Sequence, residues 1–255
     1  MHNLLEGKCA LILGVANKWS LAYAIAEAFR RAGAGVILTY QGERQRETVE
    51  AIGAELGACR VLPCDVGRDD ELERLSQALR SGGRVDAVVH SIAFANREDI
   101  TRGFLETSRE GFSLALDISA YSLVSVARAV APAMTGGGSI TTLTYIGSTR
   151  VIPNYNVMGV AKAALEASMR YLANELGPRK IRVNAISAGP VKTASARAIK
   201  DFSSMLDHVA ERAPLRRNTE PAEVADAALF LASDLGRGVT GNVLFVDSGF
   251  QIMGF

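Results

Sequence analysis

The sequence CALILGVANKWSLAYAIAEAFRRAG, residues 9–33, decides the fold class. It opens with a short apolar run, Cys9 to Leu13, which stops at Gly14. Apolar side chains then recur at spacings of four, three and four, at Leu21, Ile25, Ala28 and Ala32. This spacing is typical of one face of an α-helix. Gly33 ends the pattern, and a second apolar run, residues 35–40, follows. The segment therefore predicts a buried strand, a helix and another buried strand in succession.

The rest of the sequence repeats this alternation. Further apolar runs are found at residues 60–64, 85–91, 139–144, 181–186 and 242–246. Helical spacing is found at residues 43–56, from Asn154 or Tyr155 through Leu165, Met169, Leu172 and Leu176, and at Val224, Ala228, Leu231 and Leu235. A longer helix is expected from Arg109 to Met134, with one face formed by Phe112, Leu116, Ser119, Leu123, Val126 and Val130.

Strands that are apolar along their whole length are typical of a parallel sheet with both faces covered. Seven such strands separated by helices predict an α/β fold, with a seven-stranded parallel sheet and helices on both faces. No linker, repeat or low-complexity tract interrupts the pattern. We therefore expect residues 1–255 to form a single Rossmann-type domain.

Charge and composition narrow the choice of partners. The 28 Lys and Arg residues balance 27 Asp and Glu, and only 6% of the residues are aromatic, so the sequence predicts no nucleic-acid partner. Its three cysteines, Cys9, Cys59 and Cys64, are expected to be buried free thiols in a reducing compartment, and no Cys/His cluster has zinc-ligand spacing. No signal peptide is evident, and no run approaches the ~20 apolar residues of a membrane span. A cytoplasmic protein without a metal site is expected.

A dinucleotide site is expected at the carboxyl ends of the strands, where strand order reverses. Gly14 allows a tight turn, Ser20 can cap the next helix, and the first N–H groups of that helix can hold a pyrophosphate. Only the first glycine of G-x-G-x-x-G is present, so an ordinary strand–loop–helix connection explains the loop equally well. Asp65, after the third strand, either binds an adenine amino group or caps a helix.

The residues at the end of the second strand, Tyr40-Gln41, bear on the choice between NADH and NADPH. No acidic residue is present there to bind the ribose 2′-OH, but Gln41 can bond that hydroxyl. Arg44 and Arg46 could attract a 2′-phosphate, and Glu43 would oppose it. The balance favours NADH slightly.

A tyrosine and a lysine are the candidate catalytic residues. Seven residues at about 100° each fall roughly 20° short of two helical turns, so Tyr155 and Lys162 would share a helix face, roughly 10.5 Å apart along its axis. Without a wider motif, such a pair is more often a half-buried ring and a solvated charge. His90 ends a buried strand and is expected to be structural, since proton transfer is already assigned.

Several motifs place this pair in a family. They are Asp65-Val66, His90-Ser-Ile-Ala93, Arg182-Val-Asn-Ala-Ile-Ser-Ala-Gly-Pro190 and Val246-Asp-Ser-Gly249. With them, the chain resembles the short-chain dehydrogenase/reductases over its whole length. Most members have Tyr-x3-Lys and a serine at the end of the preceding strand. Here Met158 lies four residues before Lys162, and Tyr145 takes the serine position. Tyr-x6-Lys with an upstream tyrosine, in Ile152-Pro-Asn-Tyr-Asn-Val-Met-Gly159, resembles the enoyl-acyl carrier protein reductases of bacterial fatty-acid synthesis.

The resemblance implies a reaction and a role for each residue. The reaction is reduction of the α,β-double bond of an enoyl thioester by NADH, the last reduction step of fatty-acid elongation. Tyr155 would donate a hydrogen bond to the enolate oxygen. Lys162 would hold the nicotinamide ribose and favour proton delivery by its charge. Tyr145 would line the thioester pocket.

The same resemblance assigns binding residues. The expected cofactor contacts are Gly14, Ser20, Leu21, Gln41, Asp65, Val66, Ile92, Lys162, Val191, Lys192, Thr193, Ala194 and Ser195. The expected substrate contacts are Ala95, Tyr145, Tyr155, Phe202 and Met205, with a substrate-binding segment at about residues 193–214. Many relatives have glycine at the position of Ala93.

Partners and assembly are also implied by the resemblance. The substrate would arrive on acyl carrier protein, which Arg197 and Lys200 could meet. The helices from Arg109 and Tyr155 and the C-terminal residues would build a homotetramer. A segment between Ala194 and Arg212 is expected to be disordered without cofactor. Two alternatives stay open: a carbonyl or alcohol reductase of the same superfamily, and a dinucleotide sensor without turnover. The displaced tyrosine counts against the first, and the intact Tyr155 and Lys162 count against the second.

Overall fold

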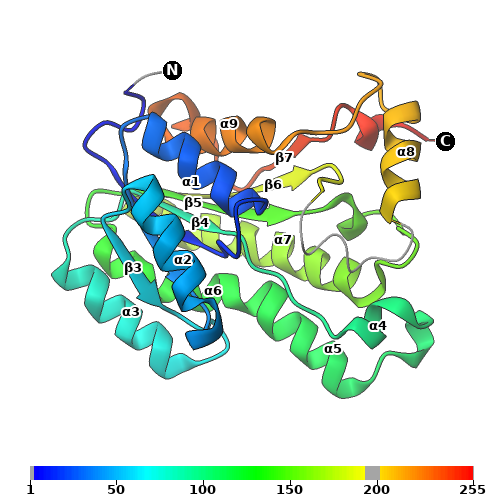
Figure 1. Cartoon of the computed structure of the whole chain (residues 1–255), viewed down its shortest axis with the longest axis horizontal. Helices are drawn as coiled ribbons and strands as arrows, with labels where there is room; N and C mark the ends of the chain where they lie inside the picture. The colour runs from blue at the N-terminus through cyan, green and yellow to red at the C-terminus, as the bar shows by residue number, and fades with distance from the viewer. Residues whose placement is uncertain (1–2, 193–201, 255) are drawn as a thin grey trace.

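A seven-stranded parallel sheet forms the centre of the molecule (Figure 1). The structure is a computed structural model, and it describes residues 3–192 and 202–254. The strand order is β3-β2-β1-β4-β5-β6-β7, so the order reverses between β1 and β4. The strands are β1 Cys9–Leu13, β2 Gly35–Tyr40, β3 Arg60–Pro63, β4 Ala87–His90, β5 Gly138–Thr144, β6 Ile181–Ala188 and β7 Val243–Val246. The predicted α/β fold is confirmed.

Helices cover both faces of this sheet. They are α1 Leu21–Arg31, α2 Glu43–Leu56, α3 Asp69–Ser81, α4 Arg97–Thr101, α5 Arg109–Leu116, α6 Ser122–Val130, α7 Asn156–Leu176, α8 Phe202–Arg212 and α9 Pro221–Ala232. One apolar cluster packs the sheet against α3, α6 and α7, and a second packs it against α1, α2 and α9.

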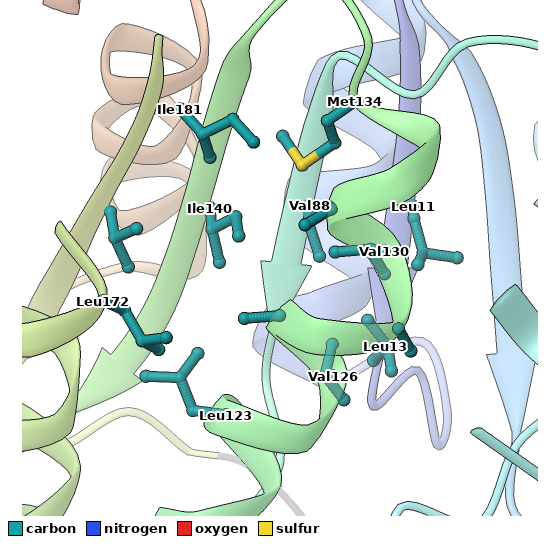
Figure 2. Packing of buried hydrophobic residues seen from close by; sticks show 14 of the residues in the cluster. Leu11, Leu13, Val88, Leu123, Val126, Val130, Met134, Ile140, Leu172 and Ile181 are labelled. Atoms are coloured by element: carbon teal, nitrogen blue, oxygen red, sulfur yellow. The ribbon is translucent and has the colours of Figure 1, made fainter. Parts of the chain in front are cut away.

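Strand β1 shows why the strands are apolar throughout. Leu11 and Leu13 point into the first cluster, whereas Ala10 and Ile12 point into the second. Successive side chains of a strand point to opposite faces, so a strand covered on both sides needs apolar residues at every position. Figure 2 shows the first cluster, in which Leu11 and Leu13 lie beside Val88 of β4 and Val126 and Val130 of α6.

The predicted helix from Arg109 to Met134 is interrupted. A π-helical turn, Asp117–Tyr121, separates α5 from α6, and a short 3-10 turn, Ala131–Ala133, follows. A π-helical turn takes one residue more than an α-helical turn, so it rotates the apolar stripe. Phe112, expected on the buried stripe, is consequently 37% exposed. Ser119 in the π-helical turn holds the loop after β4, because its hydroxyl donates to Phe94 O and accepts from Phe94 N, both at 2.8 Å.

Other expectations also need correction. Leu235 lies outside α9, in an exposed 3-10 turn, because the helix ends at Ala232. Within the segment Ala194–Arg212, part of which was expected to be disordered, residues 202–212 form α8 with Leu206 and Val209 buried. The rest of the segment expected to be disordered lies outside the described residues. Cys59 is exposed, although all three cysteines are free as expected.

One helical stretch of the described chain, Arg109–Ala133, is long and apolar enough to cross a membrane, contrary to expectation. Of its most apolar window, 61% is buried inside the protein, and the core helix of a soluble protein passes the same test. Within residues 3–192 and 202–254, no group of three or more His, Cys, Asp and Glu side chains could hold a metal ion.

Candidate active site

The site lies where the strand order reverses. Gly14 follows β1 and Ser91 follows β4, and their backbones pass so closely that a Cβ on residue 14 would collide with the Ser91 carbonyl oxygen. The φ of Gly14 is +93°, a conformation that disfavours other residues. These two constraints leave glycine as the fitting residue at the start of the first loop.

Helix α1 begins directly after this loop. Ser20 is its N-cap, and the Ser20 hydroxyl accepts a hydrogen bond from Tyr23 N at 3.2 Å. The predicted cap is therefore present. The first N–H groups of a helix have no partner within the helix, so the start of α1 offers candidate donors for an anion. Leu21 is the first residue of the helix and is partly buried.

The expected adenosine contacts meet at the ends of β2 and β3. Gln41 Nε2 donates to Asp65 Oδ2 at 3.1 Å, and Gly67 N donates to Asp65 Oδ1 at 3.0 Å. Asp65 thus shapes the turn, whereas the N-cap of α3 is Arg68, so the helix-capping alternative for Asp65 is wrong. Val66 is buried beside it.

Charged side chains after β2 affect whether a 2′-phosphate on the adenosine ribose would be attracted. The Arg46 guanidinium donates to Glu50 at 2.8 Å and to Glu43 at 3.4 Å. Both carboxylates compete with a 2′-phosphate for this arginine. Ile92, on the other side of the site, packs against the apolar core.

Two tyrosine rings lie edge to face at the end of β5. Tyr145 directly follows the strand, Tyr155 is the N-cap of α7, and the ring centroids are 5.0 Å apart with an interplanar angle of 70°. Burial raises the pKa of Tyr145 to about 12, with a further contribution from Asp247. Burial, with Tyr145 nearby, raises the pKa of Tyr155 still further above its usual range. Both phenols are therefore hydrogen-bond donors near neutral pH.

The backbone around Tyr155 is not a regular helix. Asn154 and Asn156 have φ values of 62° and 40°, in the left-handed region that asparagine tolerates better than most residues. The expected 20° offset between Tyr155 and Lys162 therefore does not apply, since it requires continuous helix. The Asn156 amide also donates to Ile100 O at 3.0 Å and Arg102 O at 2.8 Å, which ties α4 to the start of α7.

Lys162 is buried on α7, with 5% of its surface exposed. Its Nζ donates to Leu143 O at 2.8 Å. Burial lowers the pKa of Lys162 to about 8, and the charge of Glu166 opposes this shift. A lysine with this pKa is still substantially protonated near neutral pH.

His90 has the structural environment that the sequence predicts. Its ring nitrogens lie 2.9 Å from Thr142 Oγ1 and 2.8 Å from Ser122 Oγ, in full burial. Burial, assisted by the charge of Lys162, lowers the pKa of His90 to about 3. The imidazole is therefore neutral, and both nitrogens are engaged.

The expected substrate contacts lie on three segments. Tyr145 Oη donates to Met205 Sδ of α8 at 3.4 Å, so these two residues are in contact. Phe202, at the start of α8, and Ala95, in the loop after β4, are partly buried.

Two of the expected cofactor contacts follow β6, where Val191 is buried and Lys192 is exposed. Five expected contacts lie outside the described residues, namely Thr193, Ala194, Ser195, Arg197 and Lys200.

The sequence did not single out two residues that the structure places at the site. Asn156 flanks Tyr155, as described above. Asp247 Oδ1 and Oδ2 accept from Gly249 N at 3.0 Å and Gln251 N at 2.8 Å, close enough to Tyr145 to affect its pKa. The Val246-Asp-Ser-Gly249 motif was the available signal for Asp247.

A cavity of about 490 Å³ borders Tyr155 on another side. It is lined by Phe104, residues 147–152, Asn156, Gly159, Val160 and Ala163. None of the other expected substrate residues lines it. Its lining is therefore distinct from the Tyr145–Met205 contact.

A candidate dinucleotide site at the reversal point of a doubly wound sheet, with a tyrosine and a lysine on the adjacent strand–helix unit, is the arrangement of the short-chain dehydrogenase/reductases, a class of oxidoreductases. The comparison with known families narrows this class. The model for enoyl-(acyl carrier protein) reductase matches residues 14–251. The chain belongs to the enoyl-acyl carrier protein reductase family.

Individual relatives are similar over almost their whole length. The chain is 53% identical to the enoyl-acyl-carrier-protein reductase (NADH) FabI of Bacillus cereus, covering 98% of this chain and 99% of the relative. It is 51% identical to the corresponding Bacillus subtilis protein, covering 99% of each. The crystal structure of the Bacillus cereus enoyl-acyl carrier protein reductase with NADP+ and indole naphthyridinone matches with a TM-score of 0.98, at 53% identity and with full coverage of both chains.

Proposed function

We propose that this protein reduces the α,β-double bond of an enoyl thioester carried on acyl carrier protein, with NADH as the reductant, as the last reduction step of fatty-acid elongation. The observation that carries the proposal is the edge-to-face pair of tyrosines at the end of β5, of which Tyr155 is buried, together with the buried Lys162 anchored on Leu143 of the same strand. Family membership and the named activity of the relatives support the same reaction.

The residues at the strand ends fit a dinucleotide. The loop at Gly14 and the N-terminus of α1 would take the pyrophosphate, and Gln41 with Asp65 would take the adenosine. Lys162 would hold the nicotinamide ribose, and residues 191–195 would complete the nicotinamide end. When bound, NADH supplies the hydride that adds to the β-carbon of the substrate.

NADH is the favoured form of the cofactor. The Bacillus cereus and Bacillus subtilis relatives are named as NADH enzymes, whereas the Staphylococcus aureus relative, 48% identical over 97% of this chain and 98% of its own, is named as an NADPH enzyme. In this chain Glu43 and Glu50 engage Arg46, which weakens the attraction for a 2′-phosphate.

The side chains divide the chemistry among themselves. Hydride addition leaves negative charge on the thioester carbonyl oxygen, and the Tyr155 hydroxyl would donate a hydrogen bond to it. Burial keeps this phenol protonated, so it serves as a donor rather than a base. The Lys162 ammonium adds positive charge to the same region. Tyr145, packed against Tyr155 and bonded to Met205, would shape the thioester pocket together with Ala95 and Phe202.

The wider organisation is proposed with this activity. Residues 1–255 would form one dinucleotide-binding and catalytic domain, with its substrate-binding segment at about 193–214, in the cytoplasm and without a membrane. Exposed aromatic residues on the helices favour a homotetramer, since Phe112, Tyr121 and Tyr171 are 37%, 46% and 78% exposed. Light scattering at micromolar concentration tests this assembly, and a monomer mass would exclude it.

One assay tests the proposed reaction. NADH oxidation is measured with enoyl thioesters of increasing chain length, and with ketoacyl thioesters and simple ketones as comparators. We expect turnover with the enoyl thioesters alone. Turnover restricted to the carbonyl substrates would identify a carbonyl reductase instead, and NADH binding without turnover would identify a sensor.

A further inference from the structure

Two buried charged residues lie one turn apart on α7. Lys162 and Glu166 are 5% and 6% exposed, and residues four apart share a helix face. Their anchors are consecutive residues of β5. Lys162 Nζ donates to Leu143 O at 2.8 Å, and Thr144 Oγ1 donates to Glu166 Oε1 at 2.7 Å. The carboxylate and the ammonium are thus held along the same strand, directly before Tyr145.

Burial makes this arrangement costly unless the charges compensate each other. An isolated buried charge is unfavourable, and a buried lysine responds by losing its proton. Burial does lower the pKa of Lys162, and the charge of Glu166 acts in the opposite direction. A single hydroxyl, from Thr144, is the partner that the described chain offers the Glu166 side chain.

The other titratable groups around Lys162 do not replace this charge. His90, on β4, is neutral because burial depresses its pKa. Tyr155, at the start of α7, keeps its proton because burial raises its pKa. Asp117, in the π-helical turn beside α7, is exposed to solvent, where its charge is screened. Glu166 is therefore the buried anion near the lysine.

We propose that Glu166 is a positioning residue, whose buried carboxylate, fixed by Thr144, keeps Lys162 protonated at the nicotinamide-ribose site. The role rests on the proposed function in one respect, namely that Lys162 holds NADH. The protonation state of the lysine then depends on a residue whose side chain is bonded within the protein, to Thr144.

The consequence is a shift in pH dependence, and its sign follows from the charge. Glu166 raises the pKa of Lys162, so its removal lowers that pKa, and NADH affinity is then lost at a lower pH. For a shift of about one pKa unit, the protonated fraction at pH 8 falls from about one half to about one tenth, or about fivefold. At about pH 6 both forms are protonated and the affinities converge.

NADH binding is the readout, because it does not require turnover. Trp19, the one tryptophan of the sequence, adjoins Ser20 at the proposed pyrophosphate loop, so we expect energy transfer from its indole to bound NADH as the signal. Titrations from about pH 6 to about pH 9 compare wild type with Glu166→Gln, which keeps a hydrogen-bond acceptor for Thr144, and with Glu166→Asp, which keeps the charge. Asp86→Asn is the matched control, because Asp86 is a buried acid paired with Arg84 before the amino end of β4.

NADH affinity falls as the pH rises and Lys162 loses its proton. We expect this fall to occur at lower pH in Glu166→Gln, to return toward the wild-type pH in Glu166→Asp and to be unchanged in Asp86→Asn. The proposal would be overturned if folded Glu166→Gln lost NADH affinity at the same pH as wild type, or if Asp86→Asn showed an equal shift. If Glu166→Gln fails to fold, Thr144→Val is measured in its place. An unchanged pH dependence of NADH affinity in Thr144→Val would also overturn the proposal. If the variants shift NADH binding as expected but wild type reduces no enoyl thioester, the proposed reaction is wrong while the role of Glu166 stands.

Discussion

Replacement of Tyr155 by phenylalanine isolates one hydroxyl group. The phenyl ring can keep its edge-to-face packing on Tyr145, at a centroid distance of 5.0 Å. No hydrogen bond joins the Tyr155 hydroxyl to the described part of the chain, so its removal orphans no polar group among those residues. We therefore expect an unchanged melting temperature and nearly unchanged NADH affinity, with the effect confined to catalysis.

The expected size follows from the loss of one donor to a developing oxyanion. Such a loss typically lowers kcat by about 10²–10³-fold. We expect Tyr155→Phe at or below the lower end, about 100-fold, because the ribose 2′-OH can reach the same oxygen. Hydride addition to an activated alkene also does not need complete proton transfer. In a carbonyl reductase, by contrast, the same change would abolish activity.

The assay measures kcat and KM for an enoyl thioester and for NADH in three variants. Tyr145→Phe is expected to be milder than Tyr155→Phe. Tyr171→Phe, on the same helix but 78% exposed, serves as the control and is expected to match wild type. An unchanged kcat in Tyr155→Phe would refute the catalytic assignment. A larger loss in Tyr145→Phe would mean that the two roles are reversed.

Substitutions at three further positions test other parts of the site. Lys162→Ala is expected to weaken NADH binding and lower kcat together, and a fall in kcat alone would contradict its ribose role. Gly14→Ala is expected to cost about 2–5 kcal/mol in denaturant unfolding and to abolish NADH binding, because the new Cβ meets the Ser91 carbonyl in a positive-φ turn. Asn156→Ala is expected to be about 1 kcal/mol less stable than Asn156→Gly, since glycine retains the left-handed backbone. Equal stability of those two variants would argue against strain at this position.

The sheet was predictable because its signal is local. A strand buried on both faces must be apolar at each position, as Ala10 to Leu13 are, and periodic residues such as Leu165 and Met169 place a helix without tertiary knowledge. Helix α3 carried the same signal in Leu72, Leu75 and Leu79, which are buried at helical spacing, although no helix was assigned there.

Parts of the site depend on contacts between distant segments, and these escaped sequence reasoning. Asn156 acts through carbonyl groups 54 and 56 residues away, and Thr144 bonds Glu166 across 22 residues. Neither residue type is rare enough to attract notice in a sequence. The rotated face at Phe112 had the same origin, because a π-helical turn leaves no local pattern of its own.

That π-helical turn has a consequence for how the sequence can vary. Asp117–Tyr121 contains one residue more than a regular helix would need, and the extra length brings Ser119 to Phe94. Deletion of one residue would allow an unbroken helix and withdraw this clamp from the loop after β4. Family members that keep the loop are therefore expected to retain both the length of this segment and a hydroxyl at position 119, and to accept substitutions at its other positions while excluding deletions.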